Sequence, residues 1–286
     1  MVTDINLELK NRIAEDVRNA LTEDIGSGDL TAQLVPEEQW AHARLTLRED
    51  AVLCGIDWFN EVFAQLGNKV VIQWHIADGD LIKAGSPLCE LEGPARTLLT
   101  GERTAMNFLQ TLSATATATR AFCMAIENTK TVILDTRKTL PGLRLAQKYA
   151  VRTGGAQNHR TGLFDGVLIK ENHIYASGGI DKAVAAALAQ DSNVMIEVEV
   201  ESLDEARAAI KAGAHRLLLD NFNTEQMRDA VDLRNQLNEA VGLEASGNVS
   251  LNTVQDIAET GVDFISIGTL TKDVRAVDLS MRFEMA

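Results

Sequence analysis

The stretch of residues 194–221, VMIEVEVESLDEARAAIKAGAHRLLLDN, decides the fold of this 286-residue chain. Its first part, Val194–Val198, is rich in apolar β-branched residues and is typical of a strand. The apolar spacing of Leu203–Ala212 is that of a helix, and Arg216–Leu219 is again strand-like. A strand, a helix and a second strand in this order predict two parallel strands joined by a right-handed crossover.

The same alternation continues on both sides of this stretch, from Lys130 to Thr271. The further strand-like runs are Val132–Asp135, Gly166–Ile169, Gly242–Ala245 and Phe264–Ile267. The further helix-like runs are Leu143–Thr153, Ile180–Gln190, Thr224–Leu237 and Leu251–Thr260. An open doubly wound sheet would fit repeats of this length. There is room for about six or seven strand–helix units, too few to close a barrel of eight, so we expect an incomplete α/β barrel of about six to seven parallel strands.

The first part of the chain has a different pattern. Helical apolar spacing runs from Asp4 to Leu21, and several short strand-like runs lie between Ala43 and Glu92. A long helical pattern then follows. We therefore predict a smaller N-terminal α/β sheet domain at residues 1–112 and the barrel domain at residues 113–272.

The composition narrows the class of function. The net charge is -14 and the sequence pI is near 4.8, without the basic run that a nucleic-acid binder needs. No segment approaches the ~18 apolar residues of a membrane span, and the N-terminus is too polar for a signal peptide. The three cysteines, Cys54, Cys89 and Cys123, are scattered, which argues against a disulfide framework or a zinc site. We expect a cytoplasmic protein that binds neither nucleic acid nor membrane.

Charged and polar residues follow the carboxyl end of each strand-like run. These segments are Asp135–Thr139, Lys170–His173, Glu197–Glu201, Asp220–Asn221, Ser246–Asn248 and Gly268–Thr269. In parallel α/β folds the carboxyl ends of the strands share one face, where ligands bind. The side chains expected to meet there are Arg137, Lys138, Lys170, Glu199, Asp220 and Ser246. A solvated loop would explain any one of these segments, but not the whole set.

The charges of this predicted pocket indicate its ligand. Cations gather in an acidic protein, with His159 and Arg160 added by a glycine-led loop that begins at Gly154. Such a cluster needs an anionic ligand, and arginine suits carboxylates and phosphates. We expect His159 to serve as a donor to the substrate rather than as an acid–base catalyst. Glu199 and Asp220 could orient the cations, hold a magnesium ion, stabilise positive charge on a substrate, or form structural ion pairs.

Two segments have the features of phosphate cradles. Ser246-Gly247-Asn248 precedes a helix expected near Asn252, and Gly268-Thr269 follows Ile267 at the end of the last strand. Backbone amides at such sites point at an anion, and glycine allows its close approach.

Five motifs, taken together, resemble quinolinate phosphoribosyltransferase. They are Glu102–Gln110, Asp135–Thr139, Gly154-Gly155 with Asn158-His159-Arg160, Lys170–His173 and Ser246–Asn248. The resemblance covers nearly the whole chain in the same order. It implies a glycosyltransferase of NAD biosynthesis with an N-terminal α/β domain and an incomplete barrel, assembled as a homodimer. The tail, residues 273–286, is implied to pack on the first domain.

The resemblance also implies roles for single residues. The residues that would bind the quinolinate carboxylates are Arg137, His159, Arg160 and Arg103 of the partner subunit. Those with a catalytic part would be Lys138 and Lys170, beside the carboxylate or phosphoribosyl pyrophosphate, and Glu199 and Asp220, which would hold Mg²⁺ directly or through the substrate. The 5-phosphate would lie at Ser246, Gly247, Asn248, Ile267, Gly268 and Thr269, and Thr136 completes the substrate-binding set. Asn248 is a departure, because many relatives carry a second glycine there.

Other functions fit parts of this pattern. A related transferase of the molybdenum-associated type would act on another base, and a sugar-phosphate isomerase or aldolase would use the phosphate loops. A non-catalytic protein that binds phosphoribosyl pyrophosphate is the non-enzymatic alternative. Formation of nicotinate mononucleotide from quinolinate would distinguish a quinolinate phosphoribosyltransferase from all of these alternatives.

Overall fold

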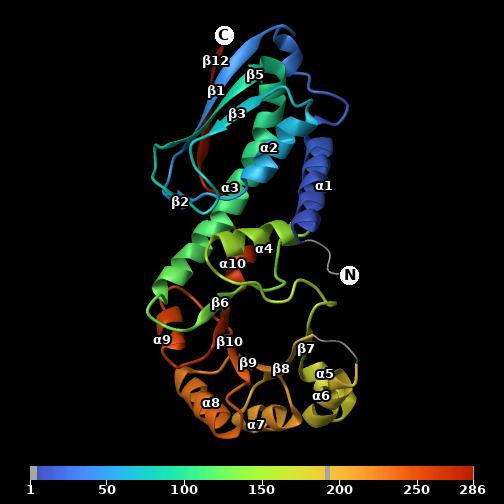
Figure 1. Ribbon diagram of the computed structural model, residues 1–286, viewed down its shortest axis with the longest axis vertical. Helices are drawn as coiled ribbons and strands as arrows, with labels where there is room; N and C mark the ends of the chain where they lie inside the picture. The colour runs from blue at the N-terminus through green and yellow to red at the C-terminus, as the bar shows by residue number, and fades with distance from the viewer. Residues whose placement is uncertain (1–4, 191–193, 286) are drawn as a thin grey trace. The chain divides into compact units, whose positions relative to one another are not determined.

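The computed structural model describes residues 5–190 and 194–285, which form two compact units (Figure 1). Unit 1 consists of Met1–Arg120, Thr139–Gly155 and Thr271–Ala286, and unit 2 of Ala121–Lys138 and Ala156–Leu270. The boundary expected between residues 112 and 113 falls inside one continuous helix, α3, Ala95–Ala125. Residues 139–155 were expected in the barrel domain. They belong to unit 1, where Arg120 Nε donates to the carbonyl of Gly154 and Gln147 donates to that of Thr271.

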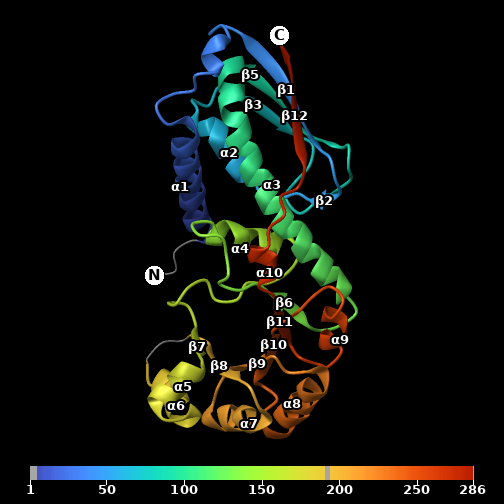
Figure 2. The same ribbon diagram turned by 180° about the vertical axis from the view of Figure 1, so that it is seen from behind.

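Unit 1 is built on a four-stranded antiparallel sheet. Its order is β12 (Leu279–Met285), β1 (Trp40–Leu47), β5 (Pro87–Pro94) and β3 (Val71–Trp74). Alternate residues of β1 are buried, as expected for a sheet with one face on a core. The strand β12 from the end of the chain pairs along β1, from Ala41 opposite Met285 to Leu47 opposite Leu279 (Figure 2). A separate antiparallel pair joins β2 (Ala51–Val52) to β4 (Leu81–Ile82).

The helices of unit 1 complete its core. They are α1 (Ile5–Ile25), the short 3-10 helix η1 (Ala32–Leu34), α2 (Ile56–Gln65), most of α3 and α4 (Arg144–Thr153). The rings of Phe59 and Trp74 meet edge to face at 5.1 Å inside this core. Asp78 caps the N-terminus of α2 by accepting hydrogen bonds from the amides of Gly55 and Ile56. Although α3 has 31 residues, no helix among the described residues has the apolar run needed to cross a membrane.

Unit 2 is built on a parallel six-stranded sheet, which confirms the expected incomplete α/β barrel of six to seven strands. Its order is β6 (Val132–Leu134), β11 (Phe264–Ser266), β10 (Gly242–Ser246), β9 (Arg216–Asp220), β8 (Ile196–Val200) and β7 (Val167–Ile169). Among the described residues no strand connects β6 to β7, so the barrel is incomplete.

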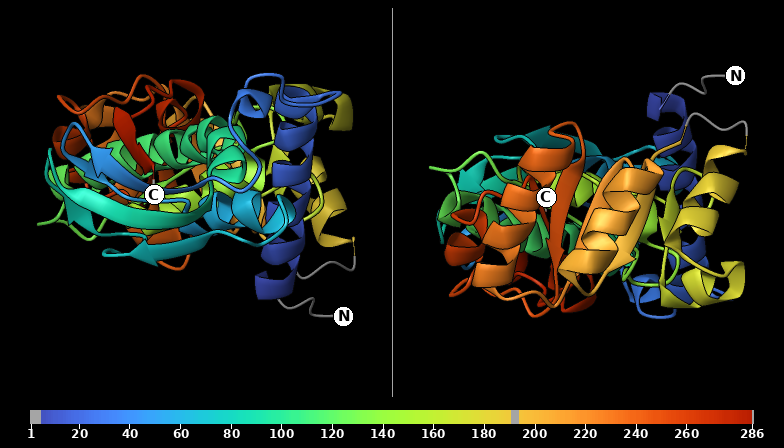
Figure 3. Two further views of the ribbon diagram at one scale, coloured as in Figure 1. Left: turned by 90° about the horizontal axis from the view of Figure 1, so that it is seen from above. Right: turned by 90° about the horizontal axis from the view of Figure 1, so that it is seen from below.

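Helices on the outer side connect these strands. They are α5 (Glu171–Ser177), α6 (Ile180–Leu188), α7 (Leu203–Ala212), α8 (Thr224–Leu237) and α9 (Val254–Ala258), and the short α10 (Thr269–Lys272) follows β11. The yellow to orange helices α6, α7 and α8 lie side by side in the right-hand view of Figure 3. Local sequence signals start them, since Ser202 caps α7 and Asn223 forms a capping box with Gln226 at α8.

Candidate active site

A cavity of about 310 Å³ opens at the carboxyl ends of the barrel strands. Nine of the residues predicted for the site line it: Thr136, Arg137, Lys138, His159, Arg160, Lys170, Glu199, Asp220 and Ser246. Leu168, Leu218, Glu244 and Ser266 complete the lining. All of these residues belong to unit 2, and the parallel topology explains why distant segments meet here.

Strand register places the polar side chains in the cavity. Ser246 of β10 lies opposite Asp220 of β9. Glu199 of β8 lies opposite Leu218 of β9, and Leu218 lies opposite Glu244 of β10. Because alternate residues of a strand point to the same side, Glu197 stands on the same face as Glu199, one step deeper.

Lys170 and Glu199 form an ion pair across β7 and β8. The Lys170 side chain is 47% exposed and that of Glu199 only 16%, so the lysine covers the carboxylate at the cavity mouth. Lys170 is also the N-cap residue of α5, and its amide donates to Nδ1 of His173 at 3.0 Å. His173 therefore serves the main chain at this corner.

The loop that carries His159 and Arg160 is anchored to β6. Asp135, at the end of this strand, accepts hydrogen bonds from the His159 amide at 2.8 Å and from Asn158 Nδ2 at 2.6 Å. Nη1 of Arg160 donates to the carbonyl of Gly166 at 2.9 Å. Burial, and then the positive charge of Arg137, lower the pKa of Arg160. Two arginines close enough to repel each other in this way make a site for an anion.

Four side chains at the base of the cavity, two of which line it, form a charged network that we call the floor network: His159, Glu197, Arg216 and Glu244. His159 Nε2 lies 2.8 Å from Oε2 of Glu197 and 3.5 Å from Oε2 of Glu244. Nη1 of Arg216 lies 3.1 Å from Oε2 of Glu244, and its guanidinium lies 3.9 Å from the ring centre of Phe264.

Both carboxyls of the floor network are shifted toward the protonated form. Burial raises the pKa of Glu197, although the charge of Arg216 opposes the shift. Burial, and then the negative charge of Glu197, raise the pKa of Glu244 to about 7. Oε1 of each carboxyl is buried without a hydrogen-bond partner among the described residues. The two groups therefore favour sharing one proton over carrying two negative charges.

Glu244 and Arg216 were not predicted as site residues, and Glu197 was named only as the first residue of a strand-end segment. Each lies inside a strand-like run rather than after it, at positions two or four residues before a predicted site residue. The sequence signal that could have identified them is their alternation with apolar residues. A charged residue that alternates with buried apolar ones on an inner strand faces the barrel interior.

Two groups of side chains in unit 2 carry atoms that metals bind. One ligand atom from each of His159, Glu197 and Glu244 lies within 4.8 Å of the others. However, His159 Nδ1 accepts the amide hydrogen of Arg160 at 2.7 Å, which leaves the ring proton on Nε2, so that atom has no lone pair for a metal. Glu199 and Asp220 both line the cavity and carry the hard oxygen donors that Mg²⁺ binds together with substrate oxygens. This second pair fits magnesium.

The remaining predicted residues lie outside the cavity lining. Gly247 has φ of 108° and Asn248 has φ of 48°, so both adopt left-handed backbone just after β10. A Cβ added to Gly268 would lie 3.0 Å from Cδ of Lys138, which places this glycine directly beside a lining residue. Ile267 is buried and Thr269 begins α10. The helix expected near Asn252 begins at Val254, and Arg103 is exposed on α3 in unit 1.

Comparison with known proteins gives the same family for both parts of the chain. The model of the quinolinate phosphoribosyl transferase N-terminal domain matches residues 29–113, and that of the C-terminal domain matches residues 115–282. The chain is 42% identical over 260 residues to a probable nicotinate-nucleotide pyrophosphorylase [carboxylating] of Bacillus subtilis, covering 91% of this chain and 89% of that protein. It is 41% identical to the nicotinate-nucleotide pyrophosphorylase [carboxylating] of Mycobacterium leprae, covering 93% and 95%.

A solved structure extends this similarity to the fold. The nicotinate-nucleotide pyrophosphorylase of Francisella tularensis superposes with a TM-score of 0.93 at 48% identity, over 96% of this chain and 97% of that one. The matched models together cover most of the sequence, including every residue that lines the cavity. The chain therefore belongs to the quinolinate phosphoribosyl transferase family.

Proposed function

We propose that this protein transfers the phosphoribosyl group of phosphoribosyl pyrophosphate to quinolinate, giving nicotinate mononucleotide, pyrophosphate and carbon dioxide in NAD biosynthesis. The observation that carries the proposal is the cavity itself, where Arg137, Arg160, Lys138 and Lys170 surround two carboxylates, Glu199 and Asp220. Two anionic substrates need such a concentration of cations to lie side by side.

Bonds form and break at two carbon atoms in this reaction: C1 of the ribose and the ring carbon next to the quinolinate nitrogen. The ring nitrogen of quinolinate attacks C1 of the ribose, and the bond from C1 to the pyrophosphate oxygen breaks. The bond from the ring carbon next to this nitrogen to its carboxylate then breaks, and carbon dioxide leaves. The electron pair stays on that carbon, is stabilised by the adjacent cationic nitrogen, and takes up a proton from solvent.

Arg137 and Arg160 bind the carboxylates of quinolinate in this proposal. Arginine presents a planar fork that matches a carboxylate, and the mutual repulsion of the two guanidinium groups falls when an anion lies between them. Lys138, after β6, and Lys170, after β7, add compact positive charges next to the quinolinate carboxylates or the phosphoribosyl pyrophosphate.

Glu199 and Asp220 face the ribose in this proposal. Positive charge develops on the ribose ring as pyrophosphate leaves, and nearby carboxylates stabilise it. Mg²⁺, held through these carboxylates and the substrate, would neutralise charge on the departing pyrophosphate. The ion pair with Lys170 keeps Glu199 in place until substrate arrives.

The 5-phosphate is assigned to the loops after β10 and β11. The left-handed backbone at Gly247 and Asn248 turns consecutive amides toward one side, next to Ser246. Ile267, Gly268 and Thr269 supply the second loop, in which the absence of a side chain on Gly268 leaves room beside Lys138.

We further propose a cytoplasmic homodimer. Arg103 stands on α3 of unit 1 and is exposed, which suits a residue that reaches into a neighbouring subunit. Each site would combine one barrel with Arg103 of the partner subunit. The scattered cysteines, two of which are buried, suit a reducing compartment.

The decisive assay is incubation of the purified protein with quinolinate, phosphoribosyl pyrophosphate and Mg²⁺, followed by chromatography and mass analysis of the products. Nicotinate mononucleotide, pyrophosphate and carbon dioxide are expected in equal amounts. Binding of phosphoribosyl pyrophosphate without turnover would support a non-catalytic binder, and turnover with a different ring would support a related transferase. Either result would overturn the proposal.

A further inference from the structure

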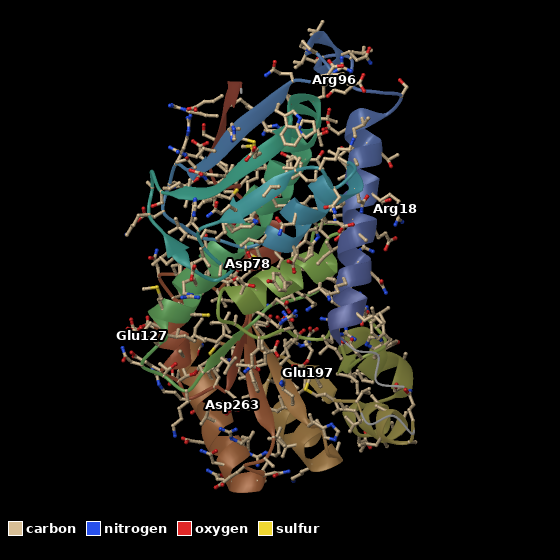
Figure 4. All side chains as sticks on the ribbon, turned by 45° about the horizontal axis from the view of Figure 1, so that its top comes forward. Arg18, Asp78, Arg96, Glu127, Glu197 and Asp263 are labelled. Carbon is tan, nitrogen blue, oxygen red and sulfur yellow. The ribbon has the colours of Figure 1, made fainter. Side chains whose placement is uncertain are left out.

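The floor network costs stability, which makes its presence informative. Its two carboxyls are completely buried, and Arg216 forms an ion pair with one of them, that of Glu244. Taking such groups out of water is unfavourable unless they are fully paired. Figure 4 labels Glu197 on its strand in unit 2. An apolar floor would cost less, so a role besides packing is indicated.

The hydrogen bonds of His159 define its tautomer. Nδ1 accepts the amide hydrogen of Arg160 at 2.7 Å, so Nδ1 carries no proton. The ring proton therefore sits on Nε2, where it points at Oε2 of Glu197 at 2.8 Å. Both ring nitrogens have partners within the protein. In this arrangement the ring proton is directed at Glu197, so the expected role of His159 as a donor to the substrate is not supported.

The hydrogen bond to Nδ1 fixes the backbone from which the Arg160 side chain extends. The amide of Arg160 is held by His159, and the far end of the side chain is held by the carbonyl of Gly166. A residue held at its amide and at its guanidinium has fewer positions to adopt, and the remaining N–H groups of the guanidinium keep one direction. The ring of His159 can hold that amide only while Nε2 keeps its proton.

We propose that Glu197, Glu244 and Arg216 are positioning residues: they hold His159 in its Nε2–H form, and His159 thereby directs Arg160 toward the carboxylate of the substrate. Arg216 keeps Glu244 in place through its ion pair and its contact with Phe264, and Oε2 of Glu197 accepts a hydrogen bond from Nε2–H of His159. The identity of the ligand rests on the proposed function, whereas the state of the ring does not.

The first test therefore reads the ring without any substrate. Protein with ¹⁵N-labelled histidine is examined by long-range ¹⁵N–¹H NMR, and the His159 signals are assigned by their loss in His159→Asn. A protonated Nε2 and a bare Nδ1 are expected near pH 7. A proton on Nδ1, or on both nitrogens, would overturn the proposal even if the protein makes nicotinate mononucleotide.

The second test weakens the network and follows both substrates. In Glu197→Gln a neutral amide replaces the carboxylate, so the Nε2 proton is held less firmly and the ring should become a mixture of tautomers. The KM for quinolinate, and its Kd by calorimetry, should rise about 10- to 100-fold because Arg160 is misplaced. The KM for phosphoribosyl pyrophosphate should stay within about twofold. If this variant does not fold, Glu197→Asp, whose shorter side chain withdraws the carboxylate from Nε2, provides the comparison.

Asp263→Asn is the matched control. Asp263 pairs with Arg234 at 2.9 Å just before β11, at the amino end of the strands, and so lies at the opposite end from the cavity. Its loss should lower stability and leave the ring of His159 and both KM values unchanged. Equal losses for both substrates in Glu197→Gln, or an unchanged His159 ring in that variant, would show that the floor is merely structural. Absence of product in the wild type would count against the proposed function alone.

Discussion

Oε2 of Glu244 lies 3.1 Å from Nη1 of Arg216, and Glu244 is completely buried there. The pair stands beside a second buried carboxyl, that of Glu197, so that one arginine faces two acids. This imbalance of charge inside unit 2 links the protonation of the barrel floor to the stability of the fold.

We predict that Glu244 makes the protein less stable as pH rises from about 4.5 to about 7. Burial and the charge of Glu197 raise its pKa from 4.5 to about 7, so the folded chain binds the proton more tightly than the unfolded chain. Its contribution to the free energy of unfolding is complete below the lower value and is lost by the upper one, in total roughly 3 kcal/mol. The raised pKa of Glu197 acts in the same direction.

Urea unfolding of the wild type and of Glu244→Gln at pH 5 and pH 7.5 measures this effect. Glutamine does not titrate, so the difference in stability between the two proteins should shift in favour of the variant at the higher pH. Parallel dependences on pH in the two proteins would show that Glu244 does not carry the proton.

We predict strong selection for a dicarboxylate. Nicotinate has one carboxylate fewer than quinolinate, so its binding would leave a cation of the cavity without its partner. The cost should reduce kcat/KM by about 10³-fold or more. Competition of the two acids in one reaction measures the ratio directly, and comparable use of nicotinate would contradict the assignment of Arg137 and Arg160.

We predict that Lys138→Ala and Lys170→Ala each lower kcat/KM by about ten- to a hundredfold while the fold survives. Both lysines line the cavity, and Lys170 also pairs with Glu199. Lys211→Ala is the control, since this exposed lysine lies in the last turn of α7. Steady-state kinetics and thermal unfolding are compared for all three. Normal kinetics in both cavity variants would place the substrates elsewhere.

We predict that Gly247→Ala raises the KM for phosphoribosyl pyrophosphate by about tenfold or more. An added Cβ would overlap Oδ1 of Asn221, and the φ of 108° disfavours any L side chain. The loop must shift, and the amides assigned to the 5-phosphate shift with it.

Gly261→Ala separates strain from binding. Gly261 also has a positive φ, of 93°, but its added Cβ would lie 3.6 Å from the nearest atom, in Val231. Both variants should lose stability, by about 1 kcal/mol or more from the backbone alone. Only Gly247→Ala should lose affinity for phosphoribosyl pyrophosphate. An equal effect of the two on the KM would remove Gly247 from the phosphate site.

We predict that Arg103 serves the partner's site. Arg103→Ala and Lys170→Ala should each be nearly inactive, whereas a reassembled equal mixture should regain about a quarter of the wild-type sites. This follows because about half of the dimers are mixed, and each mixed dimer holds one site with both residues intact. Native mass spectrometry confirms the mixed dimers. If they form without recovery of activity, each site uses its own Arg103 or none.

The strand ends were the predictable part of the site. Arg137, Lys170 and Asp220 follow strands whose apolar runs are easily found, and parallel topology brings strand ends together without knowledge of the packing. Short elements were harder to predict from the sequence. Helix α5 has no buried residue, so it leaves no apolar period in the sequence.

The floor network and the extent of unit 1 depend on tertiary contacts. Alternation along β10 indicates that Glu244 shares a face with Ser246, but which face of the sheet points inward depends on tertiary packing. The segment around α4 has the helical period of a barrel helix, yet its Tyr149 packs against Trp58, with ring centres 5.5 Å apart, in unit 1. Apolar periodicity identifies such a helix but not its partner.

The pairing of β12 with β1 sets an order for events during synthesis. β1 emerges from the ribosome early, but the strand that covers its outer edge, β12, follows only after all of unit 2. Until then β1 presents unpaired amides and carbonyls, the kind of edge on which chains aggregate. A chain that ends before β12 would keep this edge open permanently. The sheet of unit 1 is therefore completed only after every strand of unit 2 has been synthesised.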